Sequence, residues 1–174
     1  MRRAMQGRRS ISMFFRFVAA CFVLVALCCA TPATAMDIEF SKAVVVGSGP
    51  KKVVEFTDPD CPYCRNASKF FDRRADVTRY VFFNPLPNHP RAKEKVQYIL
   101  SQENKARAYH EAMAGRFDNV PKLTGITEKG IRLQVEQAAI AKGFNVDSTP
   151  TFIINGRIIV GLDVKKIEEA LGPN

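Results

Sequence analysis

The feature that constrains this chain most is a pair of cysteines, two residues apart, at the junction of a predicted strand and a predicted helix. The apolar run from Lys52 to Thr57 predicts the strand, and Asp58-Pro59-Asp60 ends it. A helix is predicted from Cys61 to about Arg74, with a proline tolerated in its first turn. Cys61 and Cys64 then lie at positions i and i+3 on one side of this helix, close enough to form a disulfide.

Apolar periodicity and turn signals predict further elements on either side of this junction. Strands are expected at 43–46, 78–83, 151–154 and 157–160, and helices at 91–102, 105–114, 127–141 and 164–171. Gly143 is expected as the glycine just beyond the helix at 127–141, and Asn155-Gly156 is a type I′ hairpin signal. The opening strand–helix–strand order implies a parallel pair with a right-handed crossover, to which the hairpin adds antiparallel strands. We therefore expect an α/β fold with a mixed central sheet and helices on both faces.

Residues 1–35 have the order of a secretory signal: an arginine-rich stretch, an apolar run and small residues at the cleavage position. The apolar run extends from Phe17 to Ala30, and Ala33-Thr34-Ala35 follows it. We expect cleavage of a signal peptide after Ala35, which leaves a short lead-in at 36–50 and one domain at 51–174. The alternative is an uncleaved membrane anchor, although a run of about 14 residues is short for a span.

The formal net charge of +9 does not indicate a nucleic-acid-binding protein. Five arginines and no acidic residue lie in 1–35, and removal of this segment leaves a net charge of +4. The remaining basic residues are scattered among acidic ones, so no basic face is predicted and nucleic acid is not an expected partner.

Only two of the five cysteines, Cys61 and Cys64, lie beyond the predicted signal peptide. A structural disulfide stabilises a protein by closing a long loop, and a separation of three residues closes almost none. Zinc prefers four ligands, and the two histidines that this part of the chain adds, His89 and His110, lack the spacing of a zinc motif. The pair is therefore interpreted as a redox pair, with no metal or other cofactor expected.

The position of the pair at the start of a helix assigns different roles to the two thiols. Unpaired backbone N–H groups and the positive end of the helix dipole favour a thiolate at Cys61, which is the expected nucleophile. Cys64, one turn further along, is the expected resolving thiol and should be more buried. Asp58 and Asp60 oppose the thiolate, whereas Arg65 favours it.

Glu55 is unusual because it interrupts an apolar strand and shares a face with Val53 and Thr57. A buried carboxylate is costly unless it has a partner or a purpose, and one purpose is proton exchange with the buried thiol of Cys64. The alternative is an edge position with the carboxylate in water. Both interpretations are open at this point.

Two segments of the chain resemble known families. Phe56 to Arg65 (Phe-Thr-Asp-Pro-Asp-Cys-Pro-Tyr-Cys-Arg) resembles the active-site segment of the DsbC/DsbG group of bacterial periplasmic disulfide isomerases. Ser148 to Gly156 is similar to the cis-proline loop and following strands of thioredoxin-like proteins. With gaps, the resemblance extends from about Lys52 to Leu171.

The resemblance implies a thioredoxin-like catalytic domain at 51–174, with a helical insertion, in a periplasmic protein. It implies a cis Thr149-Pro150 peptide beside the cysteines, and substrate contacts at Pro62, Tyr63, Thr149 and Pro150. The implied substrates are cysteines of unfolded or misfolded exported proteins, and a membrane redox partner would recycle the pair.

Three departures from the DsbC/DsbG pattern leave the direction of the redox reaction open. Only residues 36–50 precede the catalytic domain, so the dimerisation domain of those isomerases is missing and a monomer is compatible with the sequence. The predicted helices around Ile99 contain no second cysteine pair. Glu55 supplies an acid at the offset where thioredoxin and DsbA carry one.

The expected function is that of an exported protein disulfide oxidoreductase that works through Cys61 and Cys64 as oxidase, isomerase or reductase. The alternatives are a non-enzymatic, chaperone-like binding module and a partner dedicated to a single client. His89 and His110 are expected to be exposed, and neither is an expected catalytic base.

Overall fold

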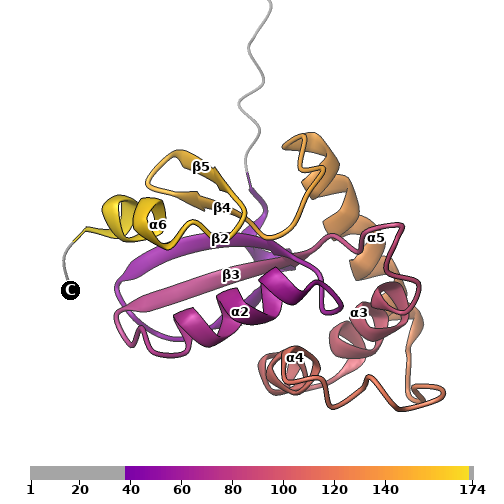
Figure 1. Cartoon of the computed structure of the whole chain (residues 1–174). Coiled ribbons are helices and arrows are strands. Elements are labelled where there is room, and N and C mark those ends of the chain that lie inside the picture. Colours follow the sequence, from indigo (N-terminus) through magenta and orange to yellow (C-terminus); the bar gives the residue numbers. More distant parts are fainter. Residues whose placement is uncertain (1–37, 173–174) are drawn as a thin grey trace, which may run out of the picture. The chain divides into compact units, whose positions relative to one another are not determined.

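The computed structural model describes residues 38–172, which form a mixed sheet with helices packed on it (Figure 1). The predicted signal peptide lies outside the described residues. The strands are β1 (Val44–Val46), β2 (Lys51–Thr57), β3 (Val77–Phe83), β4 (Thr151–Ile154) and β5 (Arg157–Val160). The helices are the short 3₁₀ helix η1 (Phe40–Lys42) and α2 (Pro62–Phe71), α3 (Ala92–Ser101), α4 (Lys105–Met113), α5 (Glu128–Gly143) and α6 (Val164–Leu171). Between residues 38 and 172, no helix has both the length and the apolar character that a membrane span requires.

The sheet has the strand order β1-β3-β2-β4-β5. β2 and β3 are parallel, with a register that runs from Lys51 opposite Val77 to Thr57 opposite Phe83. Parallel neighbours need a crossover connection, which α2 supplies. The pairs β1–β3, β2–β4 and β4–β5 are antiparallel. The α/β fold with a mixed central sheet is therefore confirmed, and the parallel pair at its centre directs the start of α2 toward one end of the sheet.

The two faces of β2 are covered by different helices, because successive side chains of a strand point to opposite faces. On one face, Val53 packs in a cluster with α2 and α6, to which Ala67 and Ile167 belong. On the other face, Phe56 packs with Phe82 and with Ala141 of α5. A third cluster joins the ends of β1 and β3 to α3 and α4, and it contains both Cys61 and Cys64. The cysteines therefore belong to the hydrophobic core and not to a surface loop.

One buried side chain joins α5 to the rest of the domain. Gln137 is fully buried, accepts a hydrogen bond from the N–H of Phe83 at 2.9 Å and donates to the carbonyl of Lys42 at 2.6 Å. It therefore connects the helix with both β3 and the end of η1.

The end of α5 differs from the sequence prediction. Gly143 is the last helical residue, and the left-handed residue beyond the helix is Asn145, with φ of 53°. The N–H of Asn145 donates to the carbonyl of Lys142, and that of Val146 to the carbonyl of Ala141, both at 3.0 Å. These two bonds define a Schellman ending, in which asparagine replaces the usual glycine because it tolerates the left-handed conformation.

The hairpin between β4 and β5 agrees with its prediction. Asn155 and Gly156 have φ of 48° and 78°, the two positive values that a type I′ turn requires. The turn pairs β4 with β5, where Ile154 lies opposite Arg157, and β4 pairs on its other side with β2, where Val54 lies opposite Ile153. It therefore fixes the strand that follows the Thr149-Pro150 segment.

Candidate active site

Cys61 occupies the N-cap position of α2, immediately before Pro62. Its backbone is extended, with φ of −77° and ψ of 121°, and its carbonyl accepts the first helical hydrogen bond, from the N–H of Arg65 at 3.1 Å. The N–H of Cys61 donates to the carbonyl of Asp58 at 3.1 Å, which closes the turn between β2 and α2. Both cysteines are present as free thiols, and Cys64 is fully buried, as predicted.

The segment before β4 meets Cys61 from the other side of the site. The sulfur of Cys61 lies 3.4 Å from the carbonyl oxygen of Thr149, and the Thr149-Pro150 peptide is cis, as the resemblance implied. The carbonyl of Pro150 accepts the N–H of Gly161 at 2.7 Å, which attaches this segment to the residue after β5. The contact thus joins residues 88 positions apart in the sequence.

The four residues predicted to contact a substrate differ in exposure. Tyr63 is 66% exposed and Pro62 is also exposed, so both form the surface beside Cys61. Thr149 is half-buried and Pro150 is buried. Substrate contact at these four residues stays a prediction.

The two thiols have opposite acidities. Hydrogen bonds to Cys61, above all from the thiol of Cys64 and also from the backbone N–H groups of Cys64 and Tyr63, outweigh desolvation and lower the pKa of Cys61 to about 5. Burial, and then the hydrogen bond to Cys61, raise the pKa of Cys64 far above its usual value. At neutral pH, the reduced pair therefore holds a thiolate at Cys61 and a protonated thiol at Cys64.

Glu55 is fully buried in the middle of the sheet, opposite Val81 of β3 and Phe152 of β4. The interpretation of an edge position in water is therefore wrong, because β2 has a neighbouring strand on each side. Its carboxylate Oε2 accepts a hydrogen bond from the guanidinium of Arg79 at 3.0 Å, whereas Oε1 is buried without a hydrogen-bond partner. Proton exchange between Glu55 and Cys64 stays a prediction.

Arg79 organises the polar network around Glu55. It donates to the hydroxyl of Tyr109 at 2.7 Å and to the carboxylate of Asp72 at 3.1 Å, and its guanidinium lies 5.3 Å from the ring centres of Phe71 and Tyr109. Burial and the negative charge of Glu55 raise the pKa of Tyr109, so this hydroxyl stays protonated. The arginine offsets the desolvation cost that a lone carboxylate would have at this position.

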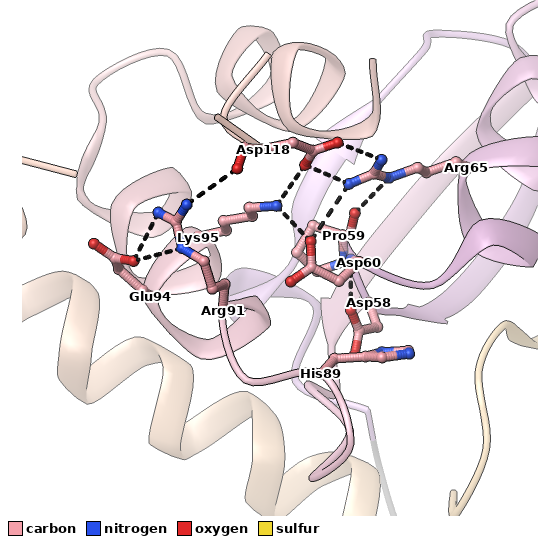
Figure 2. Close-up of polar contacts among 9 residues, drawn as sticks. All are labelled: Asp58, Pro59, Asp60, Arg65, His89, Arg91, Glu94, Lys95 and Asp118. Atoms are coloured by element: carbon pink, nitrogen blue, oxygen red, sulfur yellow. Dashed lines mark hydrogen bonds and ion pairs between the residues drawn. The ribbon is translucent and has the colours of Figure 1, made fainter. Parts of the chain in front are cut away.

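Asp58 holds the turn before Cys61 through a second set of contacts (Figure 2). Its buried carboxylate accepts the N–H of Asp60 at 2.7 Å and that of Leu86 at 2.8 Å. The same carboxylate lies 2.9 Å from Nδ1 of His89. The predicted exposure of His89 is therefore wrong: the ring is half-buried because the Pro-rich 84–90 loop folds over the turn.

Arg65 and Asp60 lie in a group of charged side chains that also contains Lys95 and Asp118 (Figure 2). The sequence analysis identified Arg65 and Asp60 but not Lys95 or Asp118, which come from α3 and from the loop after α4. Across residues 38–172, no group of three or more His, Cys, Asp and Glu side chains is arranged to hold a metal ion.

A sheet of this topology, with a Cys-X-X-Cys pair at the start of the crossover helix, defines a thioredoxin-like protein. Residues 41–170 match the family model described as a thioredoxin-like domain, and the chain belongs to this family. A search of curated protein sequences finds no significant match.

Solved structures of bacterial proteins have the same fold. A disulfide interchange protein from Neisseria gonorrhoeae is 29% identical with a TM-score of 0.65, and the match covers 78% of this chain and all of that one. The catalytic domain of ScsC from Proteus mirabilis is 19% identical with a TM-score of 0.56, over 75% of this chain and 87% of that one. The thiol-disulfide exchange protein α-DsbA2 from Wolbachia pipientis is 14% identical with a TM-score of 0.57, over 81% of this chain and 98% of that one.

Proposed function

We propose that this protein is a thiol–disulfide oxidoreductase that exchanges disulfides with cysteines of exported proteins through Cys61 and Cys64. The observation that carries the proposal is the pairing of a Cys61 thiol whose pKa is lowered to about 5 with a buried Cys64 thiol whose pKa is raised. A nucleophile that is ionised at neutral pH and a resolving thiol that stays protonated until needed are the two components of disulfide exchange.

The reaction proceeds through a mixed disulfide. In the reducing direction, the Cys61 thiolate attacks one sulfur of a substrate disulfide, the substrate S–S bond breaks, and the other substrate sulfur leaves as a thiolate. Cys64 then loses its proton and attacks the sulfur of Cys61, which releases the second substrate sulfur and leaves a Cys61–Cys64 disulfide. Oxidation of a substrate dithiol follows the same steps in reverse.

The surface beside Cys61 fits an extended polypeptide as substrate. Pro62 and Tyr63 are exposed on one side of the thiol, and the backbone of Thr149 lies on the other. Backbone groups can pair with an extended chain without regard to its sequence. This arrangement supports a substrate class of unfolded or misfolded proteins rather than a small thiol.

The finer assignment is a periplasmic protein of the DsbC/DsbG type with a thioredoxin-like catalytic domain. In this proposal, residues 1–35 are a signal peptide, 36–50 a lead-in and 51–174 the catalytic domain, and a membrane redox partner recycles the pair. The low pKa of Cys61 supports the oxidase and isomerase directions, because a stabilised thiolate favours the reduced pair and makes its disulfide a stronger oxidant.

The reduction potential of the purified protein tests the proposal. Equilibration with glutathione buffers should place the pair well above thioredoxin at about −270 mV and toward DsbA at about −120 mV. Cys64→Ser should accumulate a mixed disulfide with a substrate protein, whereas Cys61→Ser should form none. Exchange that persists in Cys61→Ser would refute the assignment of the nucleophile, and a potential near that of thioredoxin would refute the oxidising direction.

A further inference from the structure

Lys95 is a buried lysine whose ammonium group lies against two carboxylates. Its side chain is 3% exposed, and it projects from α3 toward the turn that precedes Cys61 (Figure 2). Its Nζ donates to Oδ1 of Asp60 and, at 2.6 Å, to Oδ1 of Asp118. A buried ammonium group is costly unless it is paired, so these contacts hold the lysine in one position.

Arg65 completes the group from the opposite side. It forms a two-pronged contact with Asp118, 2.7 Å at each oxygen, and lies 3.4 Å from Oδ1 of Asp60. The hydrogen bond from Arg65 is the main reason that the pKa of Asp118 falls to about 2. Two cations and two carboxylates from three segments thus form a charge cluster with no net charge, hereafter the Lys95 cluster.

The loop that carries Asp118 is held in place by contacts that do not involve Lys95. Arg91 donates to the carbonyl of Asp118 at 3.2 Å, and Glu94 accepts the N–H of Leu123 at 2.8 Å. Gly115 has φ of 77°, and a β-carbon there would lie 2.9 Å from the carboxylate of Asp118. The position of Asp118 is therefore defined by its own loop and by α3, and a change at Lys95 leaves these contacts intact.

Asp60 directly precedes the proposed nucleophile, so its charge matters for the thiolate. A negative charge close to Cys61 disfavours ionisation of the thiol, and a paired cation removes that effect. The segment at Thr149–Pro150 brings hydroxyl and carbonyl groups but no charge to the site. The charged and titratable groups around the start of α2 are Asp58, Asp60, Cys64, Arg65, His89, Lys95 and Asp118.

We propose that Lys95 is a positioning residue of the redox site: its buried ammonium group fixes the carboxylate of Asp60 and cancels its charge, so that Asp60 does not oppose the thiolate of Cys61. The inference rests on the proposed role of Cys61 as the nucleophile. It places a determinant of Cys61 reactivity on α3, in the helical layer, more than thirty positions away in the sequence.

The test is a titration of Cys61 in the reduced full-length protein, followed by the ultraviolet absorbance of the thiolate. Lys95→Met keeps the length of the side chain and removes the charge, so it should raise the pKa of Cys61 by about 0.5 to 1 unit. The double variant Asp60→Asn/Lys95→Met has no net charge in the cluster and should return to within about 0.2 units of the unmodified protein. Asp60→Asn alone leaves Lys95 unopposed and should lower the pKa of Cys61.

Two further variants separate charge from packing. Lys95→Arg keeps the charge and should titrate like the unmodified protein. Lys166→Met removes an exposed lysine that also pairs with a carboxylate, Asp163 at 2.9 Å, and should cause no change. If Lys95→Met does not fold, Lys95→Gln, which keeps N–H donors without the charge, takes its place under the same criteria.

A shift below about 0.2 units in Lys95→Met would overturn the inference, as would a double variant that titrates as high as Lys95→Met. An unchanged pKa of Cys61 in Asp60→Asn would overturn it as well. The titration needs no substrate, so its outcome is separate from the proposed function. If the unmodified protein failed to exchange disulfides, the proposed function would be wrong while the titration still measured the effect of Lys95.

Discussion

Acidification of the reduced protein should remove the stabilising contribution of the Cys61 thiolate. The pKa of this thiol is about 5 in the folded protein, whereas an unfolded cysteine has a pKa of about 8.5. Because the folded pKa is the lower one, the folded state releases its proton first as the pH rises. The thiolate therefore stabilises the folded protein at high pH, and this contribution is lost as the pH falls through about 5.

The size of the effect follows from the two pKa values. Above the unfolded pKa, the full difference is worth about 5 kcal/mol, at about 1.36 kcal/mol per unit. At pH 7, the unfolded thiol is still protonated, so about 2 to 3 kcal/mol is present, and near pH 4 almost nothing remains. When Cys61 and Cys64 form a disulfide there is no thiolate, so only the reduced protein gains this energy. At pH 7, the gain should raise the reduction potential by about 50 mV, since about 30 mV corresponds to 1.4 kcal/mol.

Urea unfolding in the presence of a reductant measures this contribution when Cys61→Ser serves as the reference. Other groups titrate in both proteins, so the change with pH in the difference between their unfolding free energies isolates Cys61. We expect that difference to shrink by about 2 to 3 kcal/mol between pH 7 and pH 4. A difference that stays constant to within about 0.5 kcal/mol would refute the thiolate assignment, whatever the stability of either protein.

Three further predictions concern residues away from the thiols. Glu55→Gln should destabilise the protein by about 2 to 4 kcal/mol in urea unfolding, because Arg79 loses one of its two carboxylate partners. Glu55→Leu/Arg79→Leu should cost less than the sum of the two single changes, and simple additivity would contradict the pairing. Gln137→Leu leaves the N–H of Phe83 and the carbonyl of Lys42 unpaired and should cost about 2 to 4 kcal/mol, seen as a lower Tm. Asn145→Gly should stabilise the protein by about 0.5 to 1 kcal/mol, because glycine adopts the positive φ without strain; a lower Tm would contradict this reason.

Local signals in the sequence were enough to predict the order of the elements and the place of the cysteines. The apolar run before Asp58 and the Asn155-Gly156 turn act over a few residues, and the structure confirms both the strand and the hairpin. The helix that starts at the cysteines was predicted three residues too long. The backbone N–H groups of Arg73 and Arg74 donate to the carbonyls of Phe70 and Phe71, three positions back. An α-helix needs bonds to the residue four positions back, so these residues form a tighter turn and the α-helix ends before them.

The contacts around the thiols join segments that are distant in the sequence and become neighbours only in the folded protein. Lys95 lies on the apolar face of α3, beside Val96 and Ile99. A lysine is almost never buried unless it is paired, so this position in the sequence indicates that Lys95 has buried partners. Its partners Asp60 and Asp118 come from other segments, and no local pattern identifies them. Likewise, Glu55 was identified as unusual, whereas Arg79 could be paired with it only once the register of β2 and β3 was known.

The contact between Cys61 and Thr149 has a consequence for the growing polypeptide. A chain made from its N-terminus presents the thiol of Cys61 88 positions before the carbonyl that completes the site. Until β4 is made, β2 also lacks its neighbour on that side. The redox site is therefore completed only when the C-terminal part of the domain has been made.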